Sequence, residues 1–208
     1  MQSTTYKLTE FFIIFILIPV SFAIEYPLWI KMCIGFFGFL YVVFVLLRVE
    51  KIKFRIASNL SWTSFFKHVT MLLVGIAILT TLYMWFADKD NLFVVVANKP
   101  LKWLAFLFIY SFLSVYPQEL IYRTFFFQRY QTLFKSEVLF VILNAIVFSL
   151  AHIFFRNGLV MVMTFIGGLL FAFTFKKTKS TLLVSIEHAI YGCWLFTVGM
   201  GSLLGFPS

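Results

Sequence analysis

The sequence predicts an all-α fold, a polytopic bundle of membrane-spanning helices, from three observations. Hydrophobic residues make up 62% of the 208 residues and charged residues only 12%, whereas soluble domains are about half apolar and about a quarter charged. Several apolar runs approach the ~20 residues that cross a bilayer as a helix. The alternating segments of ~10 residues that would indicate a membrane β-barrel do not occur.

About seven apolar runs define the expected transmembrane helices. They lie near residues 8–25, 28–47, 69–87, 101–116, 138–155, 158–175 and 181–200. The first run follows Lys7 as the apolar part of a signal peptide would, but it meets Glu25 without a small-residue cleavage site and is interpreted as an uncleaved helix. No repeat or low-complexity linker separates a second domain, so residues 1–208 are expected to form a single integral membrane domain.

Basic loops orient these helices. The loop 48–67 carries five basic residues against the single acid Glu50, and the loop 176–180 carries three lysines. Because cytoplasmic loops are enriched in Lys and Arg, both loops and the N-terminus are predicted to be cytoplasmic. The net charge of +9 lies largely in such loops, so no nucleic-acid partner is expected. The small size and the bare termini favour a bacterial cytoplasmic membrane.

The parity of these loops requires that residues 117–135 do not cross the membrane completely. An unbroken helix from 103 to 135 would be about 50 Å long, against a hydrocarbon core of ~30 Å. Pro117 removes a backbone donor and disfavours helical geometry at Tyr116. We therefore expect the preceding helix to bend or end there, and a bent or partly inserted helix to occupy 117–135. Arg129 would extend toward the headgroups.

Charged residues within apolar runs mark the candidate site, because a charge at membrane depth costs at least ~2.5 kcal/mol. Glu119 and Arg123 are spaced i, i+4 with the acid first, so they lie on one helix face and can pair. A purely structural ion pair is the alternative interpretation of these two residues.

Two histidines on other apolar segments, His152 and His188, add to this polar set. Asn144, Phe148 and His152 follow one another at intervals of four residues, so they share a helix face and can line one cavity. A single intramembrane histidine can serve packing alone, and Asn144 can serve as a hydrogen-bonding residue between helices. Two imidazoles and a carboxylate on three apolar helices favour a site.

One carboxylate with two imidazoles is suited to three kinds of chemistry. The set can activate a water molecule, bind a divalent metal such as zinc, or relay protons in a transporter. No HExxH motif and no ligand pair one turn apart occurs, so a metal is not favoured and no cofactor is expected. Cys33 and Cys193 lack paired spacing, so neither a disulfide nor a cysteine-based metal site is expected.

Three short motifs resemble, in order, those of the CAAX-protease and bacteriocin-processing family of intramembrane endopeptidases. They are "QELIYR" (118–123), "FSLAH" (148–152) and "HAIYG" (188–192). The family pattern is Glu-Glu-x-x-x-Arg, then Phe-x-x-x-His, then His-x-x-x-Asn or Asp. The resemblance covers roughly residues 101–205, which we interpret as a CAAX-protease-like core. It implies a membrane peptidase that acts on a membrane-embedded or lipidated protein or peptide.

The chain departs from the family pattern at two positions. The family's first glutamate, which activates water, aligns with Gln118, whose neutral amide cannot accept a proton from water. The closing Asn or Asp aligns with Gly192. Three outcomes follow for the carboxylate. Glu119 acts as the base with Gln118 as an amide donor, or Glu187 supplies the carboxylate, or the protein keeps the fold without proteolytic activity.

Gly192 itself has two interpretations. It is a packing glycine that lets helices approach closely, or it opens space for a water molecule or a peptide beside His188. If a polar partner is needed there, we expect Asn144 or Tyr191 to provide it.

The resulting hypothesis is an intramembrane endopeptidase in the lipid bilayer. Glu119 would activate water while His152 and His188 orient that water and stabilise the oxyanion, and Arg123 would hold Glu119. Asn144, Phe148, Gln118 and Gly192 are the supporting positions. The alternative from another class is a non-catalytic membrane binding or immunity protein that retains the fold, and a proton-coupled carrier is third.

Overall fold

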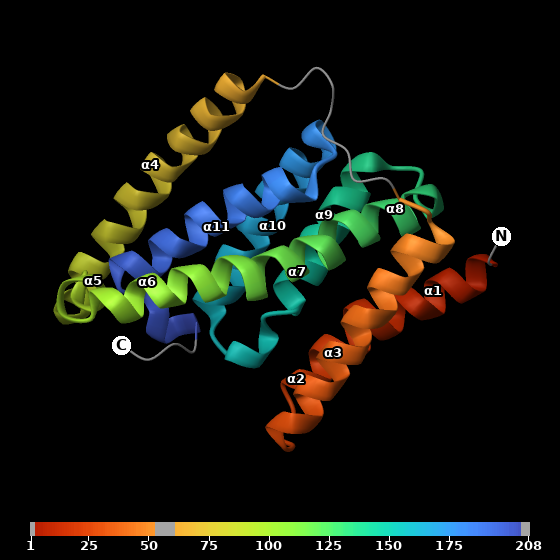
Figure 1. Cartoon of the computed structure of the whole chain (residues 1–208), viewed down its shortest axis with the longest axis horizontal. Helices are drawn as coiled ribbons and strands as arrows, with labels where there is room; N and C mark the ends of the chain where they lie inside the picture. Colours follow the sequence, from red (N-terminus) through yellow and green to blue (C-terminus); the bar gives the residue numbers. More distant parts are fainter. Residues whose placement is uncertain (1–2, 53–60, 205–208) are drawn as a thin grey trace.

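The computed structural model describes residues 3–52 and 61–204, and every regular element in these ranges is a helix (Figure 1). Seven helical runs in this described part are long and apolar enough to cross a membrane. The prediction of an all-α polytopic bundle is therefore confirmed. Lys53 and Arg55, two of the basic residues expected in the cytoplasmic loop 48–67, lie outside the described residues.

The bounds of the seven runs are close to those expected from the sequence. They are Thr4–Phe22, Leu28–Val49, Trp62–Ala87, Pro100–Leu133, Glu137–Phe155, Gly158–Thr178 and Thr181–Val198. The α-helices are α1 (Thr4–Phe12), α2 (Ile18–Phe22), α3 (Leu28–Phe44), α4 (Trp62–Ala87), α5 (Val94–Asn98), α6 (Pro100–Ile109), α7 (Tyr116–Glu119), α8 (Phe126–Tyr130), α9 (Glu137–Leu150), α10 (Gly158–Thr178) and α11 (Thr181–Val198). Wider π-helical turns lie at Ile13–Leu17, Val45–Val49, Tyr110–Val115 and Leu120–Phe125, and 3₁₀ turns at Lys89–Asn91, Gln131–Leu133, Ile153–Phe155 and Met200–Leu204.

Side-chain caps set where several of these helices begin. Ser61, Ser136 and Ser180 each accept a hydrogen bond from the backbone N–H three residues later, at 3.2–3.3 Å. Asn157 does the same for α10, from the backbone N–H of Val160 at 3.2 Å. Such caps satisfy the backbone donors that a helix leaves free at its first turn. The short connections between α9, α10 and α11 therefore end one helix and start the next within a few residues.

The fourth run is one uninterrupted helix, which corrects the expectation at Pro117. Tyr116 has φ −60° and ψ −46°, so of the two outcomes expected at Pro117, a bend or an end of the preceding helix, the end does not occur. The part near 117–135 is helical as expected, but it continues the preceding helix within Pro100–Leu133. The π-helical turn Tyr110–Val115 directly precedes the proline. Local π-helical adjustment satisfies the backbone groups that a proline leaves without a partner in a membrane helix.

The distribution of side chains is that of a protein in lipid. Leu28, Phe86 and Leu101 are exposed by 71%, 84% and 82%. By contrast, Arg123 and Glu119 are fully buried. Charged residues in membrane segments face the bundle interior and pair there, whereas apolar side chains are compatible with lipid. Together with the seven apolar runs, this pattern identifies a multi-pass integral membrane protein.

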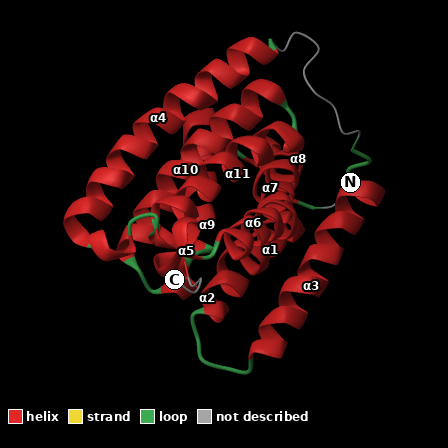
Figure 2. Cartoon of the chain, turned by 60° about the vertical axis from the view of Figure 1, so that its left-hand side comes forward, coloured by secondary structure: helices red, strands yellow, loops and turns green. Residues whose placement is uncertain are grey.

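The helices are arranged around a central group (Figures 1 and 2). The hairpin of α1, α2 and α3 packs along one flank, α4 lies along the opposite flank, and α6 to α11 lie between them. Within the central group α9 and α10 approach closely at Gly168. A Cβ added there would lie only 2.9 Å from the Ala145 Cα. Small residues at such contacts let membrane helices pack backbone to backbone. This contact sets the relative positions of the two helices that carry Phe148 and Phe171.

A buried ion network joins α1 to the ends of the second and fourth runs. Arg129 donates from Nε to Glu10 Oε2 at 2.7 Å and from Nη1 to Glu50 Oε1 at 2.8 Å. Tyr41 and Tyr130 also donate to Glu10. The Arg129 side chain is 1% exposed, so the expectation that it extends to the headgroups is wrong. Burial among two carboxylates satisfies its charge inside the bundle.

Other ion pairs agree with alternating passage of the seven runs. Lys176 and Glu137, at the end of α10 and the start of α9, are 2.6 Å apart. Arg156, which follows the fifth run, and Glu25, which follows the first run, are 3.5 Å apart. If successive runs cross the membrane in alternating directions, the two residues of each pair lie on the same side of the membrane.

Breaking the buried network is expected to cost far more stability than breaking an exposed pair. Arg129→Met leaves Glu10 as an uncompensated buried charge, so we expect a loss of about 3–5 kcal/mol. Arg156→Met, in a pair whose side chains are 63% and 89% exposed, is expected to cost less than about 1 kcal/mol. Unfolding of both variants in the same detergent measures the difference, and equal losses would contradict the structural role of the network.

Candidate active site

The centre of the candidate site is a buried contact between a carboxylate and an imidazole from two helices. His188 Nδ1, on α11, lies 2.7 Å from Glu119 Oε1, and no part of Glu119 is exposed. An ionised carboxylate only accepts hydrogen bonds, so Nδ1 of His188 is the donor in this contact when Glu119 is ionised. The other ring nitrogen, Nε2, is then an acceptor whenever the ring is neutral. The pair is thus arranged to receive a proton at His188 Nε2.

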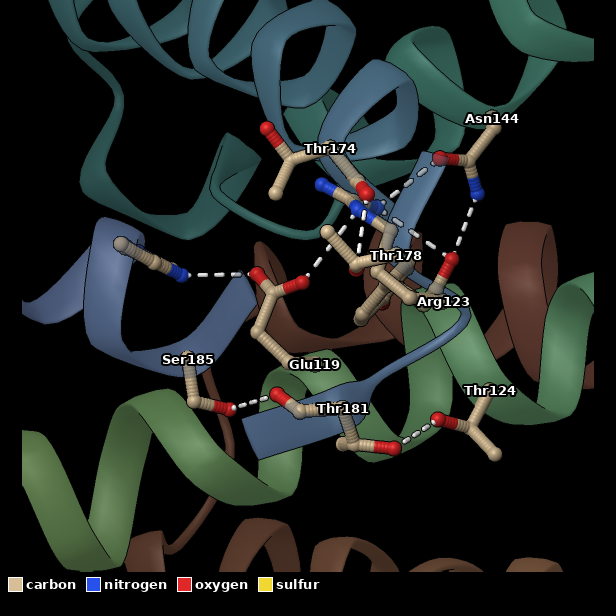
Figure 3. Close-up of polar contacts among 10 residues, drawn as sticks. Glu119, Arg123, Thr124, Asn144, Thr174, Thr178, Thr181 and Ser185 are labelled. Atoms are coloured by element: carbon tan, nitrogen blue, oxygen red, sulfur yellow. Dashed lines mark hydrogen bonds and ion pairs between the residues drawn. The ribbon is translucent and has the colours of Figure 1, made fainter. Parts of the chain in front are cut away.

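Arg123 lies on the other side of the Glu119 carboxylate (Figure 3). Its Nε is 3.3 Å from Glu119 Oε2, and its Nη1 donates to Asn144 Oδ1 at 2.9 Å. Asn144 in turn donates to the backbone oxygen of Tyr122 at 2.6 Å. The guanidinium also stacks over the Phe148 ring, 4.6 Å from its centroid. The structure therefore places Glu119 and Arg123 together, as their spacing predicts, and brings this pair against Asn144 and Phe148 of α9.

His152 lies directly after α9, where the helix ends. Its Nδ1 is 2.8 Å from the backbone oxygen of Phe148. A carbonyl oxygen only accepts, so Nδ1 donates here as well and Nε2 is left for another partner. The ring centroid of Phe148 is 5.0 Å from that of His152 and 5.7 Å from that of His188. Both imidazoles therefore contact the same phenyl ring. Among the hydrogen bonds of the described residues, none joins His152 to Glu119.

Contacts outside the sequence motifs hold His188 in place. Its ring stacks on Phe171 of α10, with centroids 4.4 Å apart and planes at 21°. The hydroxyls of Thr124 and Thr181 are 2.5 Å apart and join the fourth run to α11 (Figure 3). Sequence reasoning missed Phe171 because α10 carries no polar motif, and a phenylalanine in an apolar run gives no signal of its own.

Glu187, the alternative carboxylate, is also fully buried. Its Oε1 accepts a hydrogen bond from the Tyr191 hydroxyl at 3.1 Å. The hydrogen-bond partner of the His188 imidazole is Glu119, so adjacent positions on α11 direct the side chains of Glu187 and His188 to different neighbours. Glu119 is therefore the carboxylate that the geometry pairs with an imidazole.

The two positions that depart from the family pattern have specific surroundings. Gln118 donates from Nε2 to Ser114 Oγ at 2.8 Å. At Gly192, an added Cβ would lie 2.0 Å from the hydroxyl oxygen of Tyr110. The space beside Gly192 is thus filled by Tyr110 and not by Asn144 or Tyr191. Sequence reasoning missed Tyr110 because it belongs to no motif and reaches Gly192 only through the packing of the fourth run against α11.

The buried side-chain atoms that lack a hydrogen-bond partner in the described part of the chain gather at this site. They are Gln118 Oε1, Glu119 Oε2, Arg123 Nε and Nη2, and Glu187 Oε2. Buried polar groups in proteins are normally hydrogen-bonded to protein or to water. The concentration of these atoms on the fourth run and α11 marks the site as the place where water or polar substrate groups can bind.

The donor types do not assemble into a metal-binding group. Within residues 3–52 and 61–204, no cluster of three or more His, Cys, Asp and Glu side chains is placed to hold a metal ion. Glu119 Oε1 and His188 Nδ1, two atoms of the types that bind metals, are instead hydrogen-bonded to each other.

The comparison with protein families bears directly on this site. Residues 100–194 match the family model described as type II CAAX prenyl endopeptidase, Rce1-like. This segment is similar to the CAAX-protease family. The CAAX-protease segment runs from α6 into α11 and contains Glu119, His152 and His188, so the resemblance given by the three short motifs is confirmed. No curated protein and no solved structure matches the chain.

The CAAX-protease family is a family of membrane proteases, and the match accounts for the helices that carry the polar residues. Residues before 100 form the first three runs and lie outside the matched segment. The single domain over 1–208 and the core boundary at 205 stay predictions.

Proposed function

We propose that this protein is an intramembrane endopeptidase that hydrolyses a peptide bond of a membrane-embedded or lipidated protein or peptide. The observation that carries the proposal is the buried 2.7 Å contact between Glu119 and His188 inside the CAAX-protease segment. The substrate class follows from the family description and from the lipid-facing exterior. No cofactor is included in the proposal.

In this mechanism Glu119 and His188 act as one base. Water bound at His188 Nε2 attacks the substrate carbonyl carbon while its proton passes to the imidazole. Glu119 holds the proton on Nδ1 and offsets the charge of the imidazolium, as a buried carboxylate does for a catalytic histidine elsewhere. Because Glu119 is fully buried, we assign its effect on water to this route through the imidazole.

The peptide bond breaks when the proton held by His188 is transferred to the leaving amine. His152 has its Nε2 available because Nδ1 is directed to Phe148 O, and we propose that it orients the water or the amine. Arg123 balances the charge of Glu119 and is itself held by Asn144. Removing either partner from such a buried set leaves an uncompensated charge.

We further propose that the N-terminus and the ends around Lys177 face the cytoplasm and that the site opens there. The basic loops support this orientation. In a protein without its two natural cysteines, a single cysteine replacing Lys177 should resist a membrane-impermeant maleimide added outside the cell. A cysteine replacing Asp90, in the connection between α4 and α5, should react. Reaction at 177 with none at 90 contradicts the orientation.

The proposed hydrolysis predicts loss of cleavage in three single variants. Glu119→Ala, His152→Ala and His188→Ala should each lower cleavage of co-expressed membrane substrates, by about 10²- to 10⁴-fold for groups that move protons. His68→Ala is the matched control, since this third histidine is exposed and lies on α4. Mass spectrometry of the released peptides, with and without a chelator, measures the effect. Equal processing by wild type and all three variants would end the enzyme claim.

A non-catalytic binding or immunity protein with this fold is the second candidate, and Gln118 is the observation that favours it. Its neutral amide occupies the position of the family's water-activating glutamate and donates to Ser114. If this candidate is correct, the wild type cleaves no substrate and Gln118→Glu creates cleavage. If Glu119 and His188 suffice, the wild type is active without that change. The same substrate panel measures both proteins, and Gln118→Asn serves as the uncharged control.

A further inference from the structure

The phenol of Tyr110 occupies the space that a side chain at residue 192 would fill. Gly192 lies one helical turn after His188 on α11. A Cβ built there would be 2.0 Å from the Tyr110 hydroxyl oxygen and 2.5 Å from two ring carbons of the same residue. Distances below 3.0 Å are not compatible with real contacts between such atoms. The missing side chain at Gly192 is therefore what admits a hydroxyl group to the His188 face of α11.

Several contacts hold this phenol in place. The Tyr110 ring meets the Phe196 ring edge-on, with centroids 5.0 Å apart, and meets the His188 ring edge-on at 6.1 Å. Seven residues before Tyr110 on the fourth run, Trp103 Nε1 donates to Thr197 Oγ1 of α11 at 3.0 Å. The fourth run is thus fastened to α11 around Tyr110. The position of the hydroxyl follows from this packing of two helices.

The Tyr110 hydroxyl has no hydrogen-bond partner among the described residues, in contrast to the hydroxyls of Tyr41, Tyr130 and Tyr191. Tyr41 and Tyr130 donate to Glu10, and Tyr191 donates to Glu187. Among the hydrogen bonds of residues 3–52 and 61–204, none involves the Tyr110 hydroxyl. A phenol is both a donor and an acceptor. Its O–H is therefore free for a group that binds beside His188.

We propose that Tyr110 is a further catalytic residue, whose hydroxyl donates a hydrogen bond to the substrate carbonyl oxygen. As water attacks the carbonyl carbon, the C=O π electrons move to that oxygen, and the resulting oxyanion is stabilised by the O–H group. Donors aimed at a developing oxyanion contribute strongly to catalysis. The inference rests on the proposed hydrolysis at Glu119 and His188.

Two nearby donor atoms are already engaged, whereas Arg123 Nη2 is buried without a hydrogen-bond partner among the described residues. The Gln118 amide nitrogen donates to Ser114 Oγ, and Arg123 Nη1 donates to Asn144. Tyr110 is the hydroxyl whose place depends on Gly192 and whose O–H has no partner in the described part of the chain. Gly192 and Tyr110 are thus one structural unit, in which the glycine makes room for the donor.

Removing only the hydroxyl tests the catalytic role. In full-length protein in nanodiscs, with a prenylated peptide ending in a CAAX sequence as the probe, Tyr110→Phe is expected to lower kcat about 100-fold. KM and the melting temperature should stay close to wild type, because the ring and its packing remain. Tyr83→Phe, at an exposed tyrosine of α4, is the matched control. Full activity of Tyr110→Phe overturns the inference and leaves the proposed function standing.

A second pair of variants tests the placement without any activity. Gly192→Ala should lower the melting temperature of the wild type, because its Cβ would overlap the phenol. The same change should be tolerated in Tyr110→Ala, where the space is open. If Gly192→Ala leaves the wild type equally stable, the phenol does not occupy this space and the inference fails.

A peptide phosphonate separates this inference from the proposed function, because its anionic tetrahedral group resembles the intermediate and binds without turnover. If the wild type cleaves nothing but binds the phosphonate at least about tenfold more tightly than Tyr110→Phe does, the hydrolysis fails and the hydroxyl remains an anion donor. Without cleavage and without that difference in binding, both proposals fail.

Discussion

A charged carboxylate placed inside an apolar helix bundle is the constraint on which the rest of this structure depends. Glu119 is fully buried, and an unpaired charge in such surroundings is strongly unfavourable. Its two oxygens face His188 on α11 and Arg123 on the next helical turn. Arg123 requires Asn144 of α9 in turn. One acid thus determines how three separate helices must lie against each other, and the same contacts prepare an imidazole nitrogen to receive a proton.

The bundle buries charged side chains at two places, the Arg129 network and the Glu119 site, and the two differ in how completely their polar atoms are hydrogen-bonded. At the end of the fourth run, Arg129 is enclosed by Glu10 and Glu50, and two tyrosines complete the set. Those charges are matched within the network, so it serves to join helices. Around Glu119, by contrast, several buried polar atoms have no hydrogen-bond partner among the described residues, although Glu119 Oε2 and Arg123 Nε form an ion pair. Unmatched polar atoms beside an imidazole are what distinguish a site that can bind water and substrate from a structural ion network.

The departures from the family pattern acquire a physical meaning only together with the packing. With Gln118 at the position of the family's first acid, the proposed mechanism gives the role of base to Glu119 acting through His188, its hydrogen-bond partner. At Gly192, where the family has Asn or Asp, the space of the side chain is occupied by the phenol of Tyr110 from the fourth run. A glycine that looks like a simple packing residue in the sequence is also the reason that a hydroxyl group stands next to the candidate base.

The sequence by itself determined the features that depend on local spacing and composition. Apolar length defines the seven helices, and the four-residue intervals place Glu119 with Arg123, and Asn144 with Phe148 and His152, because positions one turn apart share a helix face. Only the tertiary structure decided that the helix continues through Pro117, that Arg129 is buried, and that Tyr110 fills the space at Gly192. These outcomes depend on contacts between helices that are distant in the chain. At each place a residue from another segment or a local change in the helix compensates a missing hydrogen bond, a buried charge or a missing side chain. Local residue spacing does not indicate which residue that will be.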